Sequence, residues 1–338
     1  MQKQIWNISK LLAWAIEYFK TKEIPEPRLS AELLLSAVLD LSRMDLYLKY
    51  DLELNDTQLK EYKEFILRRL SHEPIQYITG EAYFRKIKLN VDKSVLIPRP
   101  ETELLVERAK KVILHLAALK KSSKKSFEAC TDIASGSTDT IKASPNSNQV
   151  INVLEVGTGS GAIALSLLYE TEFNEDKTYP VDIFATDISG DALRNALKNA
   201  DRILSPEKNS HLRFFECDVL PQDNEEFLKK YLNNIDIVIS NPPYIAEANY
   251  KNLDRQIKDY EPEEALIAGK TGTEKYSHIL KKVKPFLNPG SACIIFETDP
   301  LTAPDLQKII KAEFKKSNIS IEKDYNDMDR ILVAFIGN

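Results

Sequence analysis

An apolar run in the second half of the chain is followed by four residues, Asn241-Pro242-Pro243-Tyr244, that could hold an amide for alkylation. Residues 235–239 are rich in β-branched side chains and give way to Ser240-Asn241-Pro242-Pro243-Tyr244, which predicts a buried strand that ends in a rigid loop. The prolines lack a backbone donor but keep their carbonyl acceptors, while Asn241 adds an amide oxygen and Tyr244 a flat ring. Such a loop would grip a planar group carrying an NH2, either an amide or an exocyclic amine. Taken alone, the four residues fit a plain turn equally well, because turns favour Asn and Pro.

Three more polar sites are expected at the ends of neighbouring strands. A strand over residues 151–156 leads into Gly157-Thr158-Gly159-Ser160-Gly161, where glycines permit a tight turn beside the first amides of a helix. Strands over residues 181–185 and 212–217 end near Asp187 and Asp218. In an open α/β sheet, ligands bind at the carboxyl ends of the strands, where an acidic residue after the second strand binds ribose hydroxyls. The G-x-G-x-G spacing alone is a weak signal, but together with both carboxylates and Asn241 it predicts one ligand site.

Alternating strands and helices must position these residues. Further helices are expected over residues 102–119, 274–287 and 304–314, and further strands over 293–296, 319–322 and 331–335. Ser189 or Asp191 is expected to cap a helix that continues to Ile203. This alternation predicts an α/β fold with a doubly wound sheet covered on both faces.

The first part of the chain has a different pattern. Residues 1–78 show three apolar stripes at helical spacing, the first capped by Asn7 and the third starting near Asp56. This stretch has 11 Lys and Arg against 12 Asp and Glu, so we expect a helical bundle that recognises a protein surface, with inert packing as the alternative. Residues 79–97 are expected to form a hairpin linker and residues 98–338 the catalytic domain. Residues 120–149 are polar and predict a flexible insertion, in which Lys120 belongs to a solvated tether.

Composition excludes several classes of protein. The net charge of −5 over 338 residues argues against a general nucleic-acid binder, and the apolar patch at residues 11–16 is too short for a membrane segment. Cys130, Cys217 and Cys293 lack the spacing of a metal site, so we expect no metal and a reducing, cytoplasmic location.

Several motifs together resemble the release-factor glutamine methyltransferase family of the HemK/PrmC type. The resemblance covers nearly the whole chain, and its most specific part is Ile97-Pro98-Arg99-Pro100-Glu101-Thr102-Glu103. It also includes Glu73-Pro74, the glycine loop, Asn241-Pro242-Pro243-Tyr244, Glu261-Pro262 and Asp329-Arg330. Three features depart from the family pattern: Glu155 stands where Asp is usual, no glycine follows Glu297, and residues 120–149 are an atypical insertion.

The resemblance implies a class I methyltransferase fold with a mostly parallel seven-stranded sheet and S-adenosyl-L-methionine as the methyl donor. It implies as substrate the glutamine in the Gly-Gly-Gln loop of peptide chain release factors, methylated on the side-chain nitrogen N5. It assigns the cofactor contacts to Gly157, Thr158, Gly159, Ser160, Gly161, Asp187, Asp218, Val219 and Asn241. It assigns substrate contacts to Asn241, Pro242, Pro243 and Tyr244, of which Asn241, Pro242 and Tyr244 are expected to be catalytic.

Three rival functions use parts of the same sequence. An adenine-N6 methyltransferase on DNA or RNA could use the same four residues, but it would need a basic groove. An NAD(P)-dependent oxidoreductase could use the glycine loop but leaves residues 241–244 unexplained. A non-catalytic module that binds release factors would not need Asn241 and Asp187.

Overall fold

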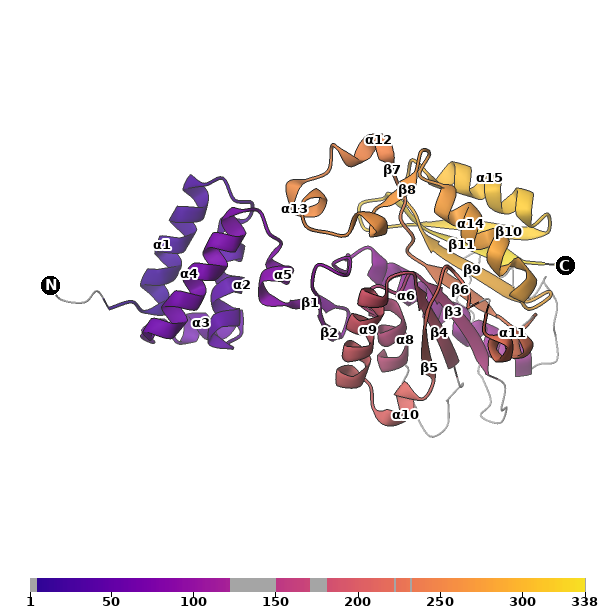
Figure 1. The fold of residues 1–338 in the computed structure, drawn as a ribbon, viewed down its shortest axis with the longest axis horizontal. Helices are drawn as coiled ribbons and strands as arrows, with labels where there is room; N and C mark the ends of the chain where they lie inside the picture. Colours follow the sequence, from indigo (N-terminus) through magenta and orange to yellow (C-terminus); the bar gives the residue numbers. More distant parts are fainter. Residues whose placement is uncertain (1–4, 122–149, 171–180, 222, 232, 338) are drawn as a thin grey trace. The chain divides into compact units, whose positions relative to one another are not determined.

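The computed structural model describes residues 5–121, 150–170, 181–221, 223–231 and 233–337. The chain divides into two compact units (Figure 1). One consists of residues 1–81 together with Leu253–Glu261, and the other of Ala82–Asn252 and Pro262–Asn338. Leu253–Glu261 groups with the N-terminal helices, and the boundary between the units falls after Glu81, so that most of residues 79–97, the expected linker, belongs to the second unit. No helix in the described part of the chain is long and apolar enough to cross a membrane.

The first unit is a set of helices around its own apolar core. Its elements are α1 (Ile8–Thr21), α2 (Pro27–Leu39), α3 (Arg43–Leu48), α4 (Asp56–Leu70), α5 (Ile75–Thr79) and the later α13 (Arg255–Lys258). Asn7 caps α1 by accepting from Lys10 N at 3.0 Å. Asn55 and Gln58 form a reciprocal capping box at the start of α4. Fully buried side chains such as Phe19, Leu34 and Leu46 fill the core.

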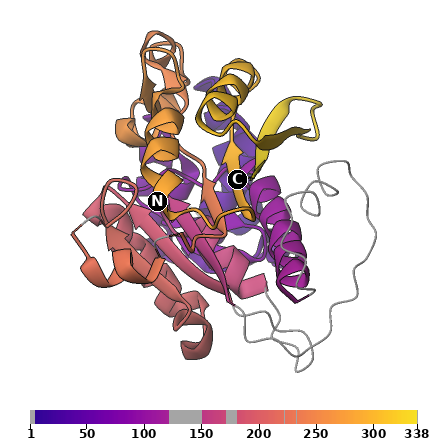
Figure 2. The same ribbon diagram turned by 90° about the vertical axis from the view of Figure 1, so that its right-hand side faces the viewer.

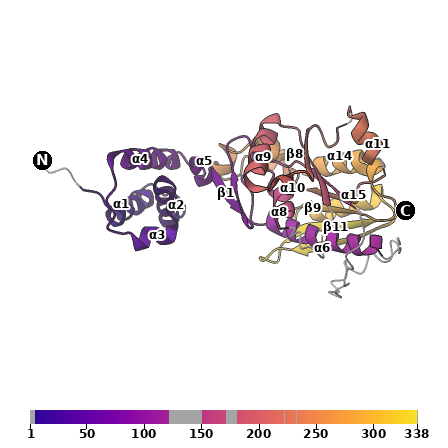
Figure 3. The same cartoon turned by 90° about the horizontal axis from the view of Figure 1, so that it is seen from below.

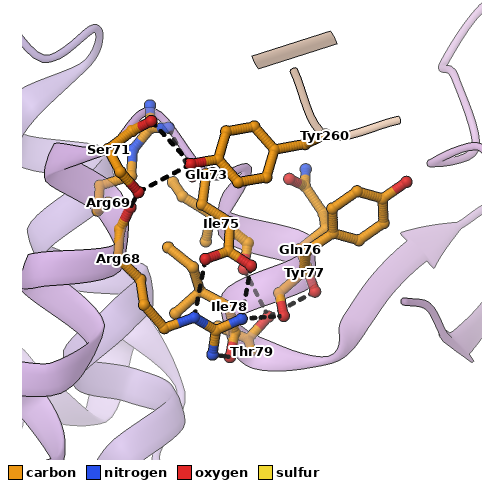
Figure 4. A network of polar contacts seen from close by, with 10 residues as sticks. All are labelled: Arg68, Arg69, Ser71, Glu73, Ile75, Gln76, Tyr77, Ile78, Thr79 and Tyr260. Atoms are coloured by element: carbon orange, nitrogen blue, oxygen red, sulfur yellow. Dashed lines mark hydrogen bonds and ion pairs between the residues drawn. The ribbon is translucent and has the colours of Figure 1, made fainter. Parts of the chain in front are cut away.

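Two arginines at the end of α4 hold the irregular parts of this unit together (Figure 4). Arg68 makes a bidentate pair with Glu73, through Nη2 at 2.7 Å and Nε at 2.9 Å, and also donates to the carbonyl of Tyr77 at 3.0 Å. Arg69 Nη1 donates to the Gln256 side chain at 2.7 Å, and Tyr260 Oη donates to the Ser71 carbonyl at 2.8 Å. The segment Leu253–Glu261 is therefore joined to the helices by polar contacts between residues that are far apart in sequence.

A hairpin, β1 (Glu81–Phe84) and β2 (Ile87–Asn90), leads into the second unit. The sheet of this unit has seven strands in the order β10-β11-β9-β6-β3-β4-β5. The strands span Ile151–Val156 (β3), Val181–Asp187 (β4), Leu212–Glu216 (β5), Ile237–Ser240 (β6), Ala292–Glu297 (β9), Ser317–Lys323 (β10) and Asp329–Ile336 (β11). Strands β9, β6, β3, β4 and β5 are parallel, and β11 is antiparallel to both β9 and β10. The prediction of a mostly parallel α/β sheet is confirmed.

Helices cover both faces of this sheet (Figures 1 and 3). Alternate side chains of the central strands, including Leu154, Val238 and Ile294, form one core cluster with α11 (Glu225–Tyr231), α14 (Glu274–Val283) and α15 (Ala303–Glu313). The opposite face packs against α6 (Thr102–Lys121), α8 (Ala162–Glu170) and α9 (Gly190–Ile203). Figure 2 shows α6 beside the C-terminal strands, where Arg108 pairs with Glu322 of β10 at 3.0 Å.

The shorter elements lie in the connections. They are α10 (Pro206–Asn209), β7 (Ile245–Ala246), α12 (Glu247–Tyr250), the 3-10 turns Glu263–Ala265 and Lys284–Phe286, and β8 (Ile267–Gly269). Strands β7 and β8 pair in parallel as a separate small sheet.

The structure changes the interpretation of the start of the insertion. Helix α6 continues to Lys121, and Lys120 Nζ lies 2.7 Å from Asp236 Oδ2 and 2.9 Å from the Val150 carbonyl. The expectation that Lys120 belongs to a solvated tether is therefore wrong, because a buried carboxylate requires a partner. The rest of the predicted insertion, residues 122–149, lies outside the described residues.

Candidate active site

The strand ends that carry the expected site residues lie side by side in the second unit. Val156, the last residue of β3, is in register with Thr186 of β4 and Ser240 of β6, and Ser240 is in register with Phe296 of β9. The next residue of each chain segment therefore lies at one level along one edge of the sheet: Asp187 and Glu297 end their strands, and Gly157 and Asn241 begin the loops that follow β3 and β6. Ser240 Oγ donates to the Val156 carbonyl at 2.6 Å, which links the first of these loops to the third.

The glycine loop forms an open cradle. Gly157 and Gly159 have φ angles of 74° and 57°, and a Cβ built at either would meet no atom within 4 Å. These two positions therefore leave free space above the backbone. Gly161, with φ of 82°, has a different role, because a Cβ there would lie 2.9 Å from Leu165 Cδ1 and would disturb the packing of α8. Thr158 and Ser160 are buried within the turn.

Asp187 holds two adjoining loops in place. Its Oδ2 accepts from Gly159 N at 2.8 Å, and its Oδ1 accepts from Ser189 N at 3.0 Å. Ser189, in turn, caps α9 by accepting from Ala192 N. Because a carboxylate has about four lone-pair sites, both oxygens keep capacity for a ligand. Burial raises the pKa of Asp187 above its ordinary value, although the backbone donors oppose this shift.

Asp218 and Val219 follow β5 but lie in different environments. The half-exposed Asp218 carboxylate contacts His278, with 2.7 Å between Oδ2 and Nε2. Val219 has a φ of 73° and a buried side chain in the core cluster, and its carbonyl accepts from Thr186 Oγ1 at 3.1 Å. A contact between Val219 and a ligand would therefore involve its backbone.

Asn241 and Tyr244 are held by residues from distant parts of the chain. Asn241 Nδ2 donates to Thr102 Oγ1 at 3.1 Å. The Thr102 hydroxyl donates to Glu297 Oε2 at 2.6 Å, and Tyr244 Oη donates to Glu297 Oε1 at 3.4 Å. Among the residues that the structure describes, Asn241 Oδ1 has no hydrogen-bond donor. Pro242 is buried and Pro243 half-buried, so the loop presents the Asn241 amide oxygen on a rigid support.

Two buried glutamates give the site unusual electrostatics. Burial raises the pKa of Glu297 to about 7, against the lowering effects of the Thr102 hydroxyl and Arg330. Burial also raises the pKa of Glu155, below the glycine loop, to about 8. Glu155 Oε2 accepts from Thr158 Oγ1 at 3.0 Å, whereas no described residue donates to the buried Oε1. Burial and the nearby Glu297 charge raise the pKa of Tyr244 above its ordinary value.

Sequence reasoning missed three polar residues at this edge. Thr102 lies in the Ile-Pro-Arg-Pro-Glu-Thr-Glu run, which carries the family resemblance without assigning the threonine hydroxyl a role. Glu297 stands out in the sequence only because no glycine follows it, although it ends a buried strand in the same way as Asp187. Nothing in the sequence pairs His278 with Asp218. In the described part of the chain, no group of three or more His, Cys, Asp or Glu side chains could hold a metal ion.

The architecture defines a class of enzyme. A mostly parallel sheet with β11 inserted antiparallel between β9 and β10 is the fold of class I methyltransferases, which use S-adenosylmethionine as cofactor. The residues present fit this cofactor. The cradle above Gly157 and Gly159 leaves room that a Cβ would occupy, and Asp187 keeps acceptor capacity beside it.

Comparison with known proteins narrows the class to a family. Residues 10–80 match the PrmC N-terminal domain, and residues 147–333 match a methyltransferase domain. A curated release factor glutamine methyltransferase from Chlorobaculum tepidum is 34% identical over 97% of this chain and 97% of its own. A release factor glutamine methyltransferase from Rhodopirellula baltica is 30% identical, over 97% of this chain and 95% of its own. A solved structure, the human methyltransferase 10 domain containing protein, has a TM-score of 0.40 at 16% identity; the match covers 74% of this chain and 89% of that one.

The chain belongs to the release factor glutamine methyltransferase family.

Proposed function

We propose that this enzyme transfers the methyl group of S-adenosylmethionine to the side-chain nitrogen N5 of the glutamine in the Gly-Gly-Gln motif of peptide chain release factors. The observation that carries this proposal is the position of Asn241. It follows the central strand β6 at the same sheet edge as the glycine cradle, and its Nδ2 is held by Thr102 while Oδ1 is left to accept from a substrate. Relatives that match over 97% of the chain have names that refer to a release factor glutamine.

The proposed site overcomes the low reactivity of an amide nitrogen. The nitrogen is a poor nucleophile because its lone pair is delocalised into the carbonyl. Asn241 Oδ1 and the Pro242 carbonyl accept the two N–H hydrogens of the glutamine, which orients the nitrogen and stabilises the positive charge that develops on it. The Tyr244 ring covers the face of the planar amide. When bound, the cofactor supplies an electrophilic methyl group on a sulfonium, whose sulfur keeps the electron pair of the broken bond.

The cofactor contacts follow the order of the strands. We assign the cradle of Gly157, Thr158, Gly159, Ser160 and Gly161 to the methionine part and Asp187 to the ribose hydroxyls. Asp218 and the backbone of Val219 take the adenine side, where His278 shares the Asp218 carboxylate. Asn241 lies next to the transferred methyl group. After the nitrogen attacks, its proton passes to water or to a nearby acceptor. The proposed mechanism assigns no role to a general base or a metal ion.

The helical residues 1–78 are assigned to release-factor recognition, with 79–97 as linker and 98–338 as the catalytic domain. We expect no direct contact with nucleic acid or a membrane, which agrees with the net charge of −5. A cytoplasmic location agrees with the free thiols of Cys217 and Cys293.

The rival function of adenine-N6 methylation would use the same four residues, but the curated relatives favour the release-factor substrate. Mass spectrometry of a release factor incubated with enzyme and S-adenosylmethionine tests the choice. We expect a gain of one methyl group on the glutamine of Gly-Gly-Gln and none in a release factor with that glutamine changed to Glu. Absence of transfer to the release factor, or comparable transfer to adenine in DNA, would contradict the proposal.

A further inference from the structure

A relay of hydrogen bonds runs from the interior of the second unit to Asn241. Glu297, at the end of β9, is 1% exposed, and Thr102, at the start of α6, is 4% exposed. The Thr102 hydroxyl lies 2.6 Å from Glu297 Oε2 and 3.1 Å from Asn241 Nδ2. Although the residues are widely separated in sequence, they form one continuous path that ends at the substrate loop.

The chemistry of the three groups gives this path a direction. An ionised carboxylate only accepts hydrogen bonds, and a threonine hydroxyl has a single proton to donate. Once Thr102 gives that proton to Glu297, its oxygen can only accept from Asn241. The Asn241 amide must then turn Nδ2 toward Thr102 and Oδ1 away from it. An amide flipped by 180° would place two lone-pair oxygens against each other at Thr102.

The second carboxylate oxygen of Glu297 is held as well. Tyr244 Oη donates to Oε1 at 3.4 Å, and Tyr276 Oη donates to the Glu297 backbone carbonyl at 2.7 Å. Tyr276 is fully buried in α14, so the backbone of Glu297 has a rigid support. The charged and titratable groups that influence Glu297 are Arg330, Glu101 and Tyr244. Burial and the Glu101 charge raise the pKa of Glu297 to about 7, while Arg330 and the hydrogen bonds from Thr102 and Tyr244 favour the ionised form. The relay, which requires that form, is therefore complete above pH 7.

We propose that Thr102 and Glu297 are positioning residues that fix the orientation of the Asn241 amide, so that Oδ1 faces the substrate nitrogen. The proposal rests on the proposed function, because it explains how the enzyme selects a substrate that donates an N–H. With the amide flipped, the Asn241 NH2 would oppose the substrate NH2, and two donors cannot bond to each other. The relay therefore makes the site prefer a substrate group that donates a hydrogen bond to Asn241 over one that accepts a hydrogen bond.

Substitution of Thr102 tests the relay through the reaction. Thr102→Val keeps the shape but removes the hydroxyl, whereas Thr102→Ser keeps the hydroxyl. In single-turnover transfer to a release factor at saturating S-adenosylmethionine, we expect Thr102→Val to slow the reaction roughly 3- to 10-fold, the equivalent of one hydrogen bond. The cofactor Kd should not change, and Thr102→Ser should restore a rate close to that of the wild type.

A double substitution separates positioning from a general effect on the fold. If Thr102 acts through Asn241, adding Thr102→Val to Asn241→Ala should cause no further loss of rate. A rate for Thr102→Val equal to that of the wild type would overturn the inference. The inference would also be overturned if Thr102→Val reduced the transfer rate by the same factor in the wild type and in Asn241→Ala.

A measurement without substrate keeps the inference separate from the proposed function. With ¹⁵N-labelled asparagine, the Asn241 side-chain NH2 resonances can be assigned by their loss in Asn241→Ala. We expect slowed hydrogen exchange of one NH2 proton in the wild type and Thr102→Ser, and fast exchange in Thr102→Val. Fast exchange in all three would contradict the relay, even if the release factor is methylated. Slow exchange without release-factor methylation would contradict the proposed function and leave the relay intact.

Discussion

At the scale of single residues, Asp187 and Asn241 each have one part of their hydrogen-bonding capacity used by the protein and one part left over. Asp187 accepts hydrogen bonds from two backbone amides but keeps further lone pairs. Asn241 Nδ2 donates to Thr102, and Asn241 Oδ1 remains available to accept a hydrogen bond. The hydrogen bonds within the protein fix the direction of each group before any ligand arrives. Preorganised groups of this kind cost no reorganisation during the reaction.

Replacement of Asp187 by alanine should weaken cofactor binding more than it slows saturated turnover, because ribose contacts change little along the reaction. The loss of a charge-assisted hydrogen bond corresponds to about 1.5–3 kcal/mol, or roughly a 10- to 150-fold rise in the S-adenosylmethionine Kd. Calorimetry measures this directly. Asp191→Ala, which removes an exposed carboxylate on α9, is the matched control and should bind normally. An unchanged Kd in Asp187→Ala would contradict the ribose assignment.

The buried Glu155 should make stability depend on pH. Its pKa in the folded protein is raised to about 8 from an ordinary value of 4.5, so the stability it contributes as a neutral acid is complete below about pH 4.5. That contribution falls as the pH rises through 8, because unfolding then releases a carboxyl group that ionises freely. Glu155→Gln mimics the neutral form at every pH. In urea unfolding, the free energy of unfolding of Glu155→Gln should therefore increase relative to that of the wild type between pH 5 and pH 8. An equal difference at both pH values would show that Glu155 has an ordinary pKa.

At the scale of elements, the strand ends were predictable and the contacts between them were not. Runs such as residues 151–156 and 181–185 are dominated by β-branched and apolar residues, with single polar residues between them, so each strand and the residue after it could be predicted locally. Thr102 and Glu297 are 195 positions apart, and no local pattern pairs them. Short helices such as α3 and α11 also went unpredicted, because one or two turns carry too little periodicity.

The substrate loop is supported by a glycine from another connection. Gly272 has a φ of 86°, and a Cβ built there would lie 2.7 Å from the Tyr244 carbonyl oxygen. Gly272→Ala should lower the free energy of unfolding by roughly 1–3 kcal/mol and reduce turnover by displacing Tyr244, with the cofactor Kd retained. The control is Gly80→Ala, where φ is 75° but a Cβ meets nothing within 4 Å. We would reject a role for Gly272 in supporting the loop if both variants kept full turnover.

At the scale of the whole molecule, the chain leaves the second unit after Asn252, joins the helical unit through Leu253–Glu261, and returns at Pro262. The segment that leaves begins only a few residues after the Asn241–Tyr244 loop. The sequence motif Glu261-Pro262 marked this region as part of the family pattern. It did not indicate that the segment packs with helices nearly two hundred residues earlier, because that depends on Arg69 and Ser71 meeting Gln256 and Tyr260.

The contact between Arg69 and Gln256 should contribute to the stability of the helical unit. Arg69 is 3% exposed, and Gln256→Ala would leave one of its buried N–H groups without an acceptor, at a cost of about 1–3 kcal/mol. Hydrogen exchange of the α4 amides reports this locally and should become faster. Arg255→Ala, which removes only an exposed ion pair with Asp259, should have little effect. Equal exchange rates in both variants would show that Leu253–Glu261 does not brace this unit.

The most direct test of the account is the rate of methyl transfer from S-adenosylmethionine to a release factor by Asn241→Ala in a single turnover at saturating cofactor. Asn241 Oδ1 is proposed to stabilise charge that appears on the glutamine nitrogen only in the transition state, so turnover should suffer more than binding. We expect the rate to fall on the order of 10²–10³-fold, as for the loss of one oxyanion-hole donor. Asn241→Asp, which keeps an acceptor oxygen, should retain more activity than Asn241→Ala. A rate for Asn241→Ala close to that of the wild type would contradict the proposed mechanism.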